Sequence, residues 1–203
     1  MRKGLFSGCI LWYNKINIRR RGGSPLQALE FAILNWIRNH LRCGVLDAVM
    51  PALSWTANHG ELWILTTLAL LGGKRSRKAG TASAYALLLN LICCNVFLKP
   101  LIGRLRPFAV NQAVELMIPA PMDAAFPSGH TAAAFAVTAA LKTSGSPLWK
   151  VALIISILMA FSRLYLYVHW PTDIVGGILL GTAMGWLGAK IAARVWRKKT
   201  AEP

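Results

Sequence analysis

Long runs of apolar residues, separated by short polar segments, make up most of this sequence. The apolar pattern predicts six membrane-crossing helices, at about residues 43–57, 61–73, 79–98, 128–141, 148–164 and 173–195. Several of these runs are shorter than the roughly 20 residues that cross a bilayer, and the first also contains Asp47 and Pro51. We therefore expect an all-α integral membrane protein, built as a six-helix bundle in a single domain.

Residues 26–41, LQALEFAILNWIRNHL, have a different pattern, because polar residues alternate with apolar ones at helical spacing. The polar positions include Glu30, Asn35, Arg38 and Asn39. This pattern predicts an N-terminal amphipathic helix that lies on the membrane surface; packing against the bundle is the alternative.

Residues 43–73 allow two interpretations, two short spans or one long span. Two spans place the basic clusters on one face: the N-terminal RRR, KRSRK at 74–78, Lys142, Lys150 and the C-terminal RKK. One span places the N-terminal cluster on the opposite face. The positive-inside rule favours two spans and makes the common face cytoplasmic. The predicted organisation is a cytoplasmic N-terminus with its amphipathic helix (1–42), a six-span domain (43–195) and a basic cytoplasmic tail (196–203).

The composition is that of a membrane protein. Of the 203 residues, 55% are hydrophobic and 15% are charged, whereas a soluble domain carries about 25% charged residues. A net charge of +16 points to nucleic acid in a soluble protein, but these Lys and Arg residues cluster between apolar runs, which is typical of loops near anionic lipid. The four cysteines show neither zinc-binding spacing nor a disulfide framework. We expect membrane lipids as partners and no nucleic acid.

Positive charges on the other, extracytoplasmic face need a separate explanation, because they oppose the orientation bias. Three polar stretches lie at the outer ends of predicted spans: KPLIGRLRP at 99–107, PSGH at 127–130 and SRLYLYVHWPTD at 162–173. Since all three lie on the same face, we expect them to meet at one site.

Phosphate binding explains the cations of these stretches. Arginine forms forked hydrogen bonds to phosphate oxygens and lysine adds a compact charge, so the candidates are Lys99, Arg106 and Arg163. Ser128 and Gly129 lie at the N-terminus of a predicted helix, a position that favours anions.

Two histidines complete a site for phosphoryl transfer. One of His130 and His169 would attack phosphorus, and the other would protonate the leaving oxygen. Asp173 follows His169 by four residues, and a carboxylate there can hold one imidazole nitrogen protonated and leave the other free. Among the seven carboxylates of the chain, only Asp173 belongs to one of these stretches. Metal sites need carboxylates placed together, so we expect a mechanism without a metal ion or other cofactor.

The three stretches resemble the motifs of the type 2 phosphatidic acid phosphatase (PAP2) superfamily. Lys-x6-Arg-Pro, Pro-Ser-Gly-His and Ser-Arg-x5-His-x3-Asp are complete and in order, and the resemblance covers roughly residues 44–195. It implies a helical membrane enzyme with its site on the outer face. It also implies that His169 is the nucleophile that forms a phosphohistidine, that Asp173 orients it, and that His130 is the general acid. The implied phosphate ligands are Lys99, Arg106, Ser128, Gly129 and Arg163.

The resemblance also bounds the substrate and the location. The small size, short loops and outer-facing site resemble bacterial members, which implies a multi-pass protein of the inner (plasma) membrane acting on a lipid phosphate or diphosphate. Among their substrates we favour undecaprenyl diphosphate, the carrier lipid of cell-wall synthesis, converted to undecaprenyl phosphate. Phosphatidylglycerol phosphate and phosphatidic acid are the alternatives. A lipid phosphotransferase with the same intermediate, and a non-enzymatic lipid transporter or scaffold, also stay open.

Three further features have two interpretations each. Arg104 contacts either a phosphate or a lipid headgroup. His59 and Glu61 form either a plain turn or the rim of a substrate entrance. The glycines of GGILLGTAMGWLGAK at 176–190 predict close helix packing, with a homodimer face as the alternative.

Overall fold

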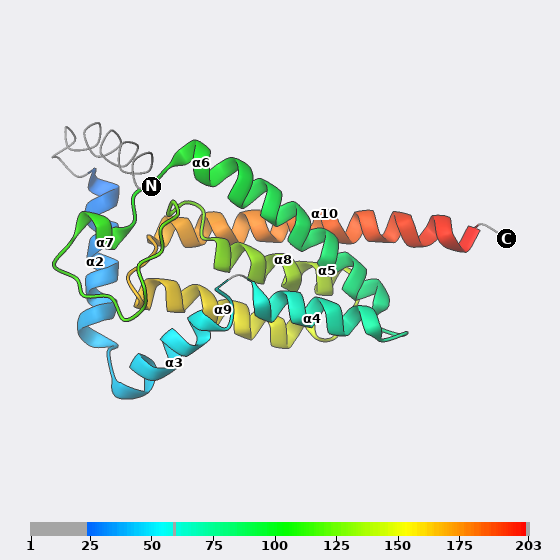
Figure 1. The fold of residues 1–203 in the computed structure, drawn as a ribbon, viewed down its shortest axis with the longest axis horizontal. Coiled ribbons are helices and arrows are strands. Elements are labelled where there is room, and N and C mark those ends of the chain that lie inside the picture. The colour runs from blue at the N-terminus through cyan, green and yellow to red at the C-terminus, as the bar shows by residue number, and fades with distance from the viewer. Residues whose placement is uncertain (1–23, 59, 202–203) are drawn as a thin grey trace, which may run out of the picture.

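The computed structural model describes the backbone of residues 24–58 and 60–201, and within them all regular structure is helical. Figure 1 shows several long helices side by side, with α2 across one end of the bundle. The elements are α2 (Pro25–His40), α3 (Gly44–Trp55), α4 (Glu61–Gly72), α5 (Arg77–Asn90), the π-helix η1 (Leu91–Leu98), α6 (Lys99–Ile102), α7 (Pro107–Val110), α8 (Gly129–Thr143), α9 (Trp149–Tyr165) and α10 (Pro171–Ala201).

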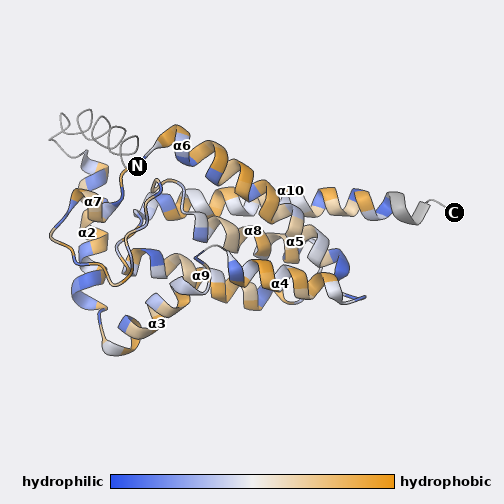
Figure 2. Cartoon of the chain, in the orientation of Figure 1, coloured by the Kyte–Doolittle hydropathy of each residue, from blue (hydrophilic) through white to orange (hydrophobic). Residues whose placement is uncertain are grey.

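The outer surface of the bundle is apolar along its length. Two of the described helical segments, Arg77–Val110 and Pro171–Arg197, are long and apolar enough to cross a membrane. Large apolar side chains such as Phe97, Leu101 and Leu179 point outward with more than half of their surface exposed. Figure 2 shows apolar residues along the middle of the bundle and polar ones gathered toward its two ends. Lipid is the solvent that such a surface requires.

Glycines of α10 allow this helix to lie directly on its neighbours. A Cβ atom added at Gly181 would lie 2.2 Å from the backbone oxygen of Ala132 in α8, so no larger residue fits without moving a helix. Close helix packing is therefore confirmed as the role of these glycines. The other such approaches are 2.8 Å from Gly177 to Ser128 O, 2.3 Å from Gly185 to Ala136 O and 2.5 Å from Gly188 to Ala86 N in α5.

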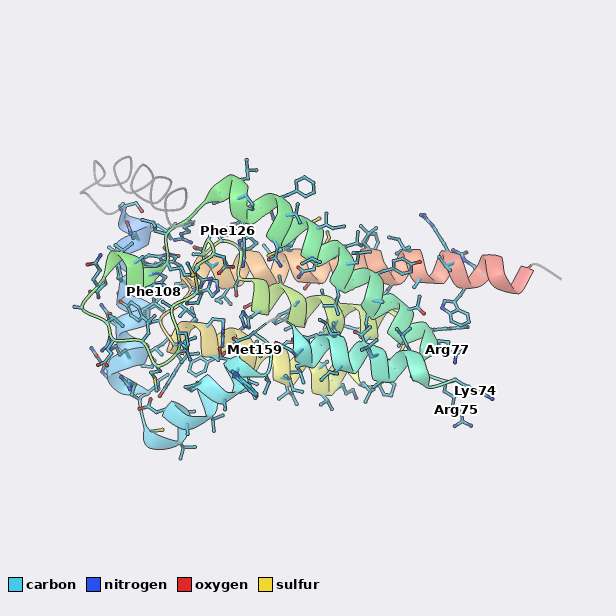
Figure 3. All side chains as sticks on the ribbon, in the orientation of Figure 1. Lys74, Arg75, Arg77, Phe108, Phe126 and Met159 are labelled. Atoms are coloured by element: carbon cyan, nitrogen blue, oxygen red, sulfur yellow. The ribbon has the colours of Figure 1, made fainter. Side chains whose placement is uncertain are left out.

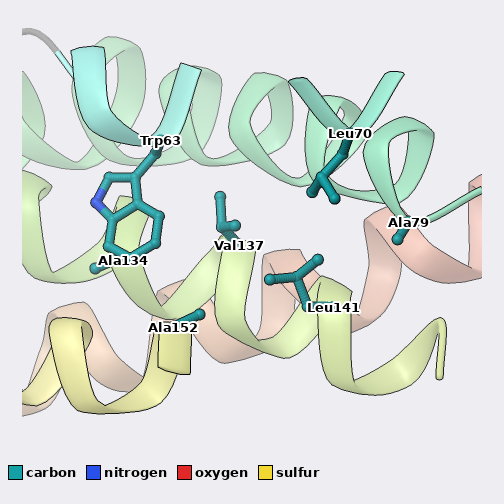
Figure 4. Close-up of a cluster of buried hydrophobic side chains, with 7 residues drawn as sticks. All are labelled: Trp63, Leu70, Ala79, Ala134, Val137, Leu141 and Ala152. Carbon is teal, nitrogen blue, oxygen red and sulfur yellow. The ribbon is translucent and has the colours of Figure 1, made fainter. Parts of the chain in front are cut away.

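An apolar cluster joins the opposite face of α8 to α4 and α9 (Figure 4). Trp63 from α4 lies beside Ala134, and Leu70 of the same helix lies near Val137 and Leu141 of α8. Helix α8 is therefore covered on both sides, and Ala134, Val137 and Leu141 are fully buried. This central position fixes the helix that begins with the PSGH stretch.

Helix α2 covers the predicted amphipathic segment 26–41 but packs against the end of the bundle. Its Leu34 lies in a buried cluster with Tyr167 and Trp170, and Ile37 lies in another with Val168. Glu30, one of the predicted polar positions, is only 2% exposed. These contacts place α2 beside the turn that carries His169. The prediction that put residues 1–42 on the face opposite the site is therefore wrong for α2, because periodicity reports an apolar face but not the element that covers it.

Helices α3 and α4 occupy the predicted segments 43–57 and 61–73, but they do not pack side by side. In Figure 1 both run in the same direction, away from the end that holds α2. An antiparallel pair joined by a short turn would pack along its length, so the two-span interpretation is wrong, and one interrupted segment replaces it. The polar Asp47 of α3 is satisfied by Arg42 at 3.1 Å and by the Tyr165 hydroxyl at 2.5 Å.

Candidate active site

The three polar stretches meet at the end of the bundle where α2 lies. Lys99 begins α6, Arg106 directly precedes α7, and Ser128 is the N-cap of α8. Arg163 lies in the last turn of α9 and Asp173 in the first turn of α10, with His169 in the turn between them. Each functional side chain is therefore attached at or next to the end of a packed helix.

A cavity of about 1050 Å³ opens among these helix ends. Its polar part is lined by Lys99, Arg106, Gly129, His130, Arg163 and His169. It continues along α4, α5 and the start of η1, where the lining becomes mostly apolar and includes Trp63, Ile64, Leu87, Leu88 and Leu91. One cavity thus joins a cation-rich end to an apolar channel.

The two ring nitrogens of His169 have different surroundings. Nδ1 faces the Asp173 carboxylate at 3.4 Å, slightly beyond ordinary hydrogen-bond length, and Nε2 lies 3.2 Å from Nη1 of Arg106. Burial lowers the pKa of His169 well below 6.5, and the nearby cations, Arg106 first among them, lower it further. The imidazole is therefore neutral near pH 7, and with the proton on Nδ1 its Nε2 lone pair faces the cations and the cavity.

Asp123, from the loop between α7 and α8, forms ion pairs with two of these cations. Its Oδ1 accepts a hydrogen bond of 2.7 Å from Nη2 of Arg106, and its Oδ2 pairs with Nζ of Lys99. Partial burial opposes ionisation, but the charges of Lys99 and Arg106 lower the pKa of Asp123 to about 2. Its carboxylate lies between two cations that the motif assigns to phosphate. Sequence reasoning missed this residue because a lone loop aspartate carries no pattern.

The PSGH residues differ in what they offer to the cavity. The Ser128 hydroxyl caps α8 and bonds to the Thr131 hydroxyl at 2.9 Å, and Ser128 does not line the cavity. Gly129 does, and a Cβ atom there would lie 3.3 Å from Nζ of Lys99, so the absent side chain leaves this lysine its room. His130 also lines the cavity, and its Nε2 is buried without a hydrogen-bond partner among the described residues. This nitrogen is available for proton transfer.

Arg163 is fixed from one side by its neighbour. Its Nε and Nη2 donate to the Ser162 hydroxyl at 3.1 and 2.9 Å, and the residue is 1% exposed. These two hydrogen bonds fix one edge of the Arg163 guanidinium, and Arg163 forms part of the cavity wall.

Arg104 does not line the cavity, although it lies between Lys99 and Arg106 in sequence. It binds the Asp173 carboxylate at 2.6 Å and the Glu30 carboxylate at 2.5 Å. Sequence reasoning missed both contacts, and the available signal for Glu30 was that it is the one acidic residue of α2.

The turn before α4 contributes to the cavity through Asn58 and Gly60. His59 lies outside the described residues, and Glu61 is not part of the lining. Among the residues that the structure describes, no three His, Cys, Asp or Glu side chains are grouped as metal ligands.

A helical membrane bundle with these three motifs at one end defines the PAP2 class of phosphatases. The chain belongs to the PAP2 superfamily, whose sequence profile matches residues 79–197. Over 157 residues the chain is 34% identical to the undecaprenyl-diphosphatase of Sulfolobus acidocaldarius, covering 75% of this chain and 74% of that protein. It is 31% identical to the undecaprenyl-diphosphatase BcrC of Bacillus subtilis, covering 70% and 73%. It is 32% identical to the decaprenylphosphoryl-5-phosphoribose phosphatase of Mycobacterium tuberculosis, covering 77% and 86%.

Two solved structures share the fold. The PAP2-type phosphatidylglycerolphosphate phosphatase of Bacillus subtilis superposes with a TM-score of 0.67 at 20% identity, covering 93% of this chain and 96% of that one. Aquifex aeolicus LpxE gives a TM-score of 0.65 at 24% identity, covering 80% and 95%. The protein is thus a PAP2-type membrane phosphatase.

Proposed function

We propose that this protein hydrolyses undecaprenyl diphosphate to undecaprenyl phosphate through a phosphohistidine on His169. The observation that carries the proposal is the cavity, in which the cations and two histidines at one end continue into an apolar channel along α4 and α5. A lipid diphosphate has the matching shape, with a polar head and a long apolar tail. Two of the relatives that the chain resembles carry this activity in their names.

The geometry supports a two-step transfer. Nε2 of His169 attacks the terminal phosphorus, the bond to the bridging oxygen breaks, and His130 donates its proton to that oxygen. Water then attacks the phosphohistidine and gives its proton to the neutral His130, which releases inorganic phosphate and restores both histidines. Lys99, Arg106 and Arg163 stabilise the charge on the equatorial oxygens.

A substrate panel tests this function. Purified protein in detergent should release phosphate faster from undecaprenyl diphosphate than from phosphatidylglycerol phosphate or phosphatidic acid, and EDTA should not change the rate. Faster release from either phospholipid would replace the proposed substrate. A loss of phosphate release in EDTA that magnesium restores would overturn the metal-free mechanism.

Transfer of phosphate to an added lipid or sugar alcohol in place of water would identify a phosphotransferase. Binding of lipid without any phosphate release would favour a transporter or scaffold.

The charge distribution supports an orientation in a bacterial inner membrane. Lys74, Arg75 and Arg77 lie at the end of the bundle far from Phe108 and Phe126 of the site loops (Figure 3). The positive-inside rule then puts this basic end in the cytoplasm and the site outside. Residues 43–195 form the phosphatase domain and cross the membrane several times, with α3 and α4 as one interrupted crossing instead of two. Residues 196–203 form a cytoplasmic tail, and α2 lies at the outer surface.

Cysteine labelling tests the orientation, with the native cysteines replaced by alanine. Cysteines at Ala28 in α2 and at the exposed Met122 beside Asp123 should both react with an impermeant thiol reagent on intact cells. A cysteine at Arg75 should react only after permeabilisation. If the cysteine at position 28, like the one at position 75, reacted only after permeabilisation, the placement of α2 at the outer surface would be overturned.

A further inference from the structure

The Arg104 side chain lies on the far side of the Asp173 carboxylate from His169. Its Nη1 donates to Oδ1 of Asp173 at 2.6 Å, and the other carboxylate oxygen, Oδ2, accepts the Trp170 N–H at 2.8 Å and faces Nδ1 of His169. Asp173 has no exposed surface. Both of its oxygens are thus held by protein groups, and removal of Arg104 would leave Oδ1 without this partner.

Glu30 from α2 holds Arg104 in turn. Its Oε2 accepts from Nη2 of Arg104 at 2.5 Å, and its Oε1 accepts from the Thr172 hydroxyl and backbone N–H at 2.5 and 3.2 Å. Thr172 also accepts from Nη1 of Arg104 at 2.7 Å. The buried Glu30 carboxylate therefore has a cation and two further donors, as a buried charge requires.

Helix α2 is attached to the same turn by other contacts. Phe31 makes an edge-to-face contact with Trp170 at 4.8 Å, and Asn35 accepts from the Tyr167 hydroxyl at 2.9 Å. The Arg104 guanidinium lies 5.2 Å from the centre of the Trp170 ring. A helix upstream of the segment that defines the family thus holds the turn that carries His169 in place.

We infer that Arg104 and Glu30 are positioning residues: Glu30 fixes Arg104, and Arg104 fixes the Asp173 carboxylate that orients His169. Neither side chain reaches the cavity, so neither touches the phosphate. This inference rests on the proposed role of His169 as the nucleophile. It predicts that loss of either residue slows the chemical step and leaves substrate binding unchanged.

Kinetics of matched variants test the inference, with whichever lipid phosphate the wild-type protein hydrolyses fastest. Arg104→Gln should lower kcat by about 10–100-fold, the range seen when partners behind metal-bound histidines are removed, and leave KM within about twofold. Arg104→Lys should recover part of kcat, and Arg75→Gln, at the opposite end, should match the wild type. Raised KM with unchanged kcat in Arg104→Gln would mean that this residue binds the substrate, and would overturn the inference.

A double variant tests whether Glu30 acts through Arg104. Glu30→Gln should lower kcat less than Arg104→Gln, and the double variant should be no slower than Arg104→Gln alone, because residues that act as one unit are not additive. If the fold-decrease in kcat of the double variant equalled the product of the two single decreases, Glu30 would not act through Arg104. Melting temperatures of all variants in detergent separate these effects from unfolding.

A spectroscopic readout separates this inference from the proposed function. Nitrogen-15 NMR of histidine should show His169 protonated at Nδ1 in the wild type and a shifted or mixed tautomer in Arg104→Gln and, where that variant does not fold, in Arg104→Lys. An unchanged His169 signal would overturn the positioning role even in an active enzyme. A wild-type protein that releases no phosphate from the panel, but shows the tautomer shift, would overturn only the proposed function.

Discussion

Helices α8 and α10 touch in two regions of opposite chemistry. Near the site, the contact is polar, with the Ser128 N–H donating to the backbone oxygen of Asp173 at 3.1 Å. Below it, the contact consists of glycine against alanine backbone, with Gly181 and Gly185 closest to α8. The polar region holds the groups for which we propose a role in the reaction, whereas the small-residue region sets the distance between the two helices. Because His130 belongs to α8 and Asp173 to α10, the packing region also sets the separation of these two proposed catalytic residues.

The difference shows that the same helix pair meets two demands with different residue types. Small residues give a close, dry contact that lipid cannot compete with. Charged residues at the end of the pair gain their positions from that contact, because a fixed backbone leaves few rotamers that satisfy all their partners. We therefore expect substitutions in the polar region to remove activity without unfolding, and substitutions in the packing region to reduce both.

The largest effect should come from His169 in the polar region. His169→Ala removes the proposed nucleophile, and we expect kcat to fall by about 10⁴–10⁶-fold, as for nucleophile or base removal in other covalent mechanisms. The melting temperature should stay close to that of the wild type. The matched control is His40→Ala, since His40 is exposed at the end of α2. If His169→Ala still released phosphate, the assignment of His169 as the nucleophile would be wrong.

The packing region should respond next, through stability. Gly181→Ala puts a methyl group into the backbone of Ala132, and overpacking of this kind costs about 1–3 kcal/mol. We expect a lower midpoint in a denaturant titration in detergent, with lower kcat in the fraction that folds. Gly72→Ala is the control, because nothing lies within 4 Å of that position. Equal stability of the two variants would contradict the close contact.

Asp123 should give a smaller effect, confined to anion binding. Asp123→Asn removes the charge that competes with phosphate for Lys99 and Arg106, so inorganic phosphate should inhibit more strongly, by up to about tenfold or ~1.4 kcal/mol. Inhibition constants of the variant and of Glu115→Gln, an exposed carboxylate of the same loop, provide the comparison. Weaker inhibition in Asp123→Asn would mean that the carboxylate supports phosphate binding.

The pH profile should give the mildest effect. Burial and neighbouring cations lower the pKa of His169, so its neutral, nucleophilic form persists to pH values below 6.5. As the pH falls, kcat/KM should decrease when His169 becomes protonated. The midpoint of this decrease should therefore lie below pH 6.5. Arg106→Gln removes a cation beside His169, so a change in this midpoint in the variant would assign the decrease to His169. A midpoint above pH 6.5 that changes in this way would contradict the expectation, because the pKa of His169 would then not be lowered.

Much of the bundle was predictable because its signals are local. The runs predicted at 128–141 and 148–164 agree within a few residues with α8 and α9. The motif residues also meet, since they lie at the ends of neighbouring spans. The direction of α3 and α4 was not predictable from loop charge, because that argument assumed that α2 lies at the end opposite the site, whereas α2 packs against the site end. Glu30 and Asp123 were missed for a related reason: their partners lie 74 and 17 residues away, and no periodicity encodes such pairs.

The glycines of α10 also fix how this helix is aligned lengthwise against α8. Sliding α10 along α8 by one helical turn would shift it by about 5.4 Å. Since the glycines recur every four residues, such a slide would still put a glycine at the position of Gly181, but it would bring Asp173 to the position of Gly177 or Ala189 to that of Gly185. The alignment in which Gly177, Gly181 and Gly185 meet backbone atoms of α8 and its N-cap is also the one that puts the first turn of α10 beside the first turn of α8. A contact of glycines against the backbone and small side chains of α8 thus determines, at some distance, which residues of the two helices stand opposite each other at the end that holds the motifs.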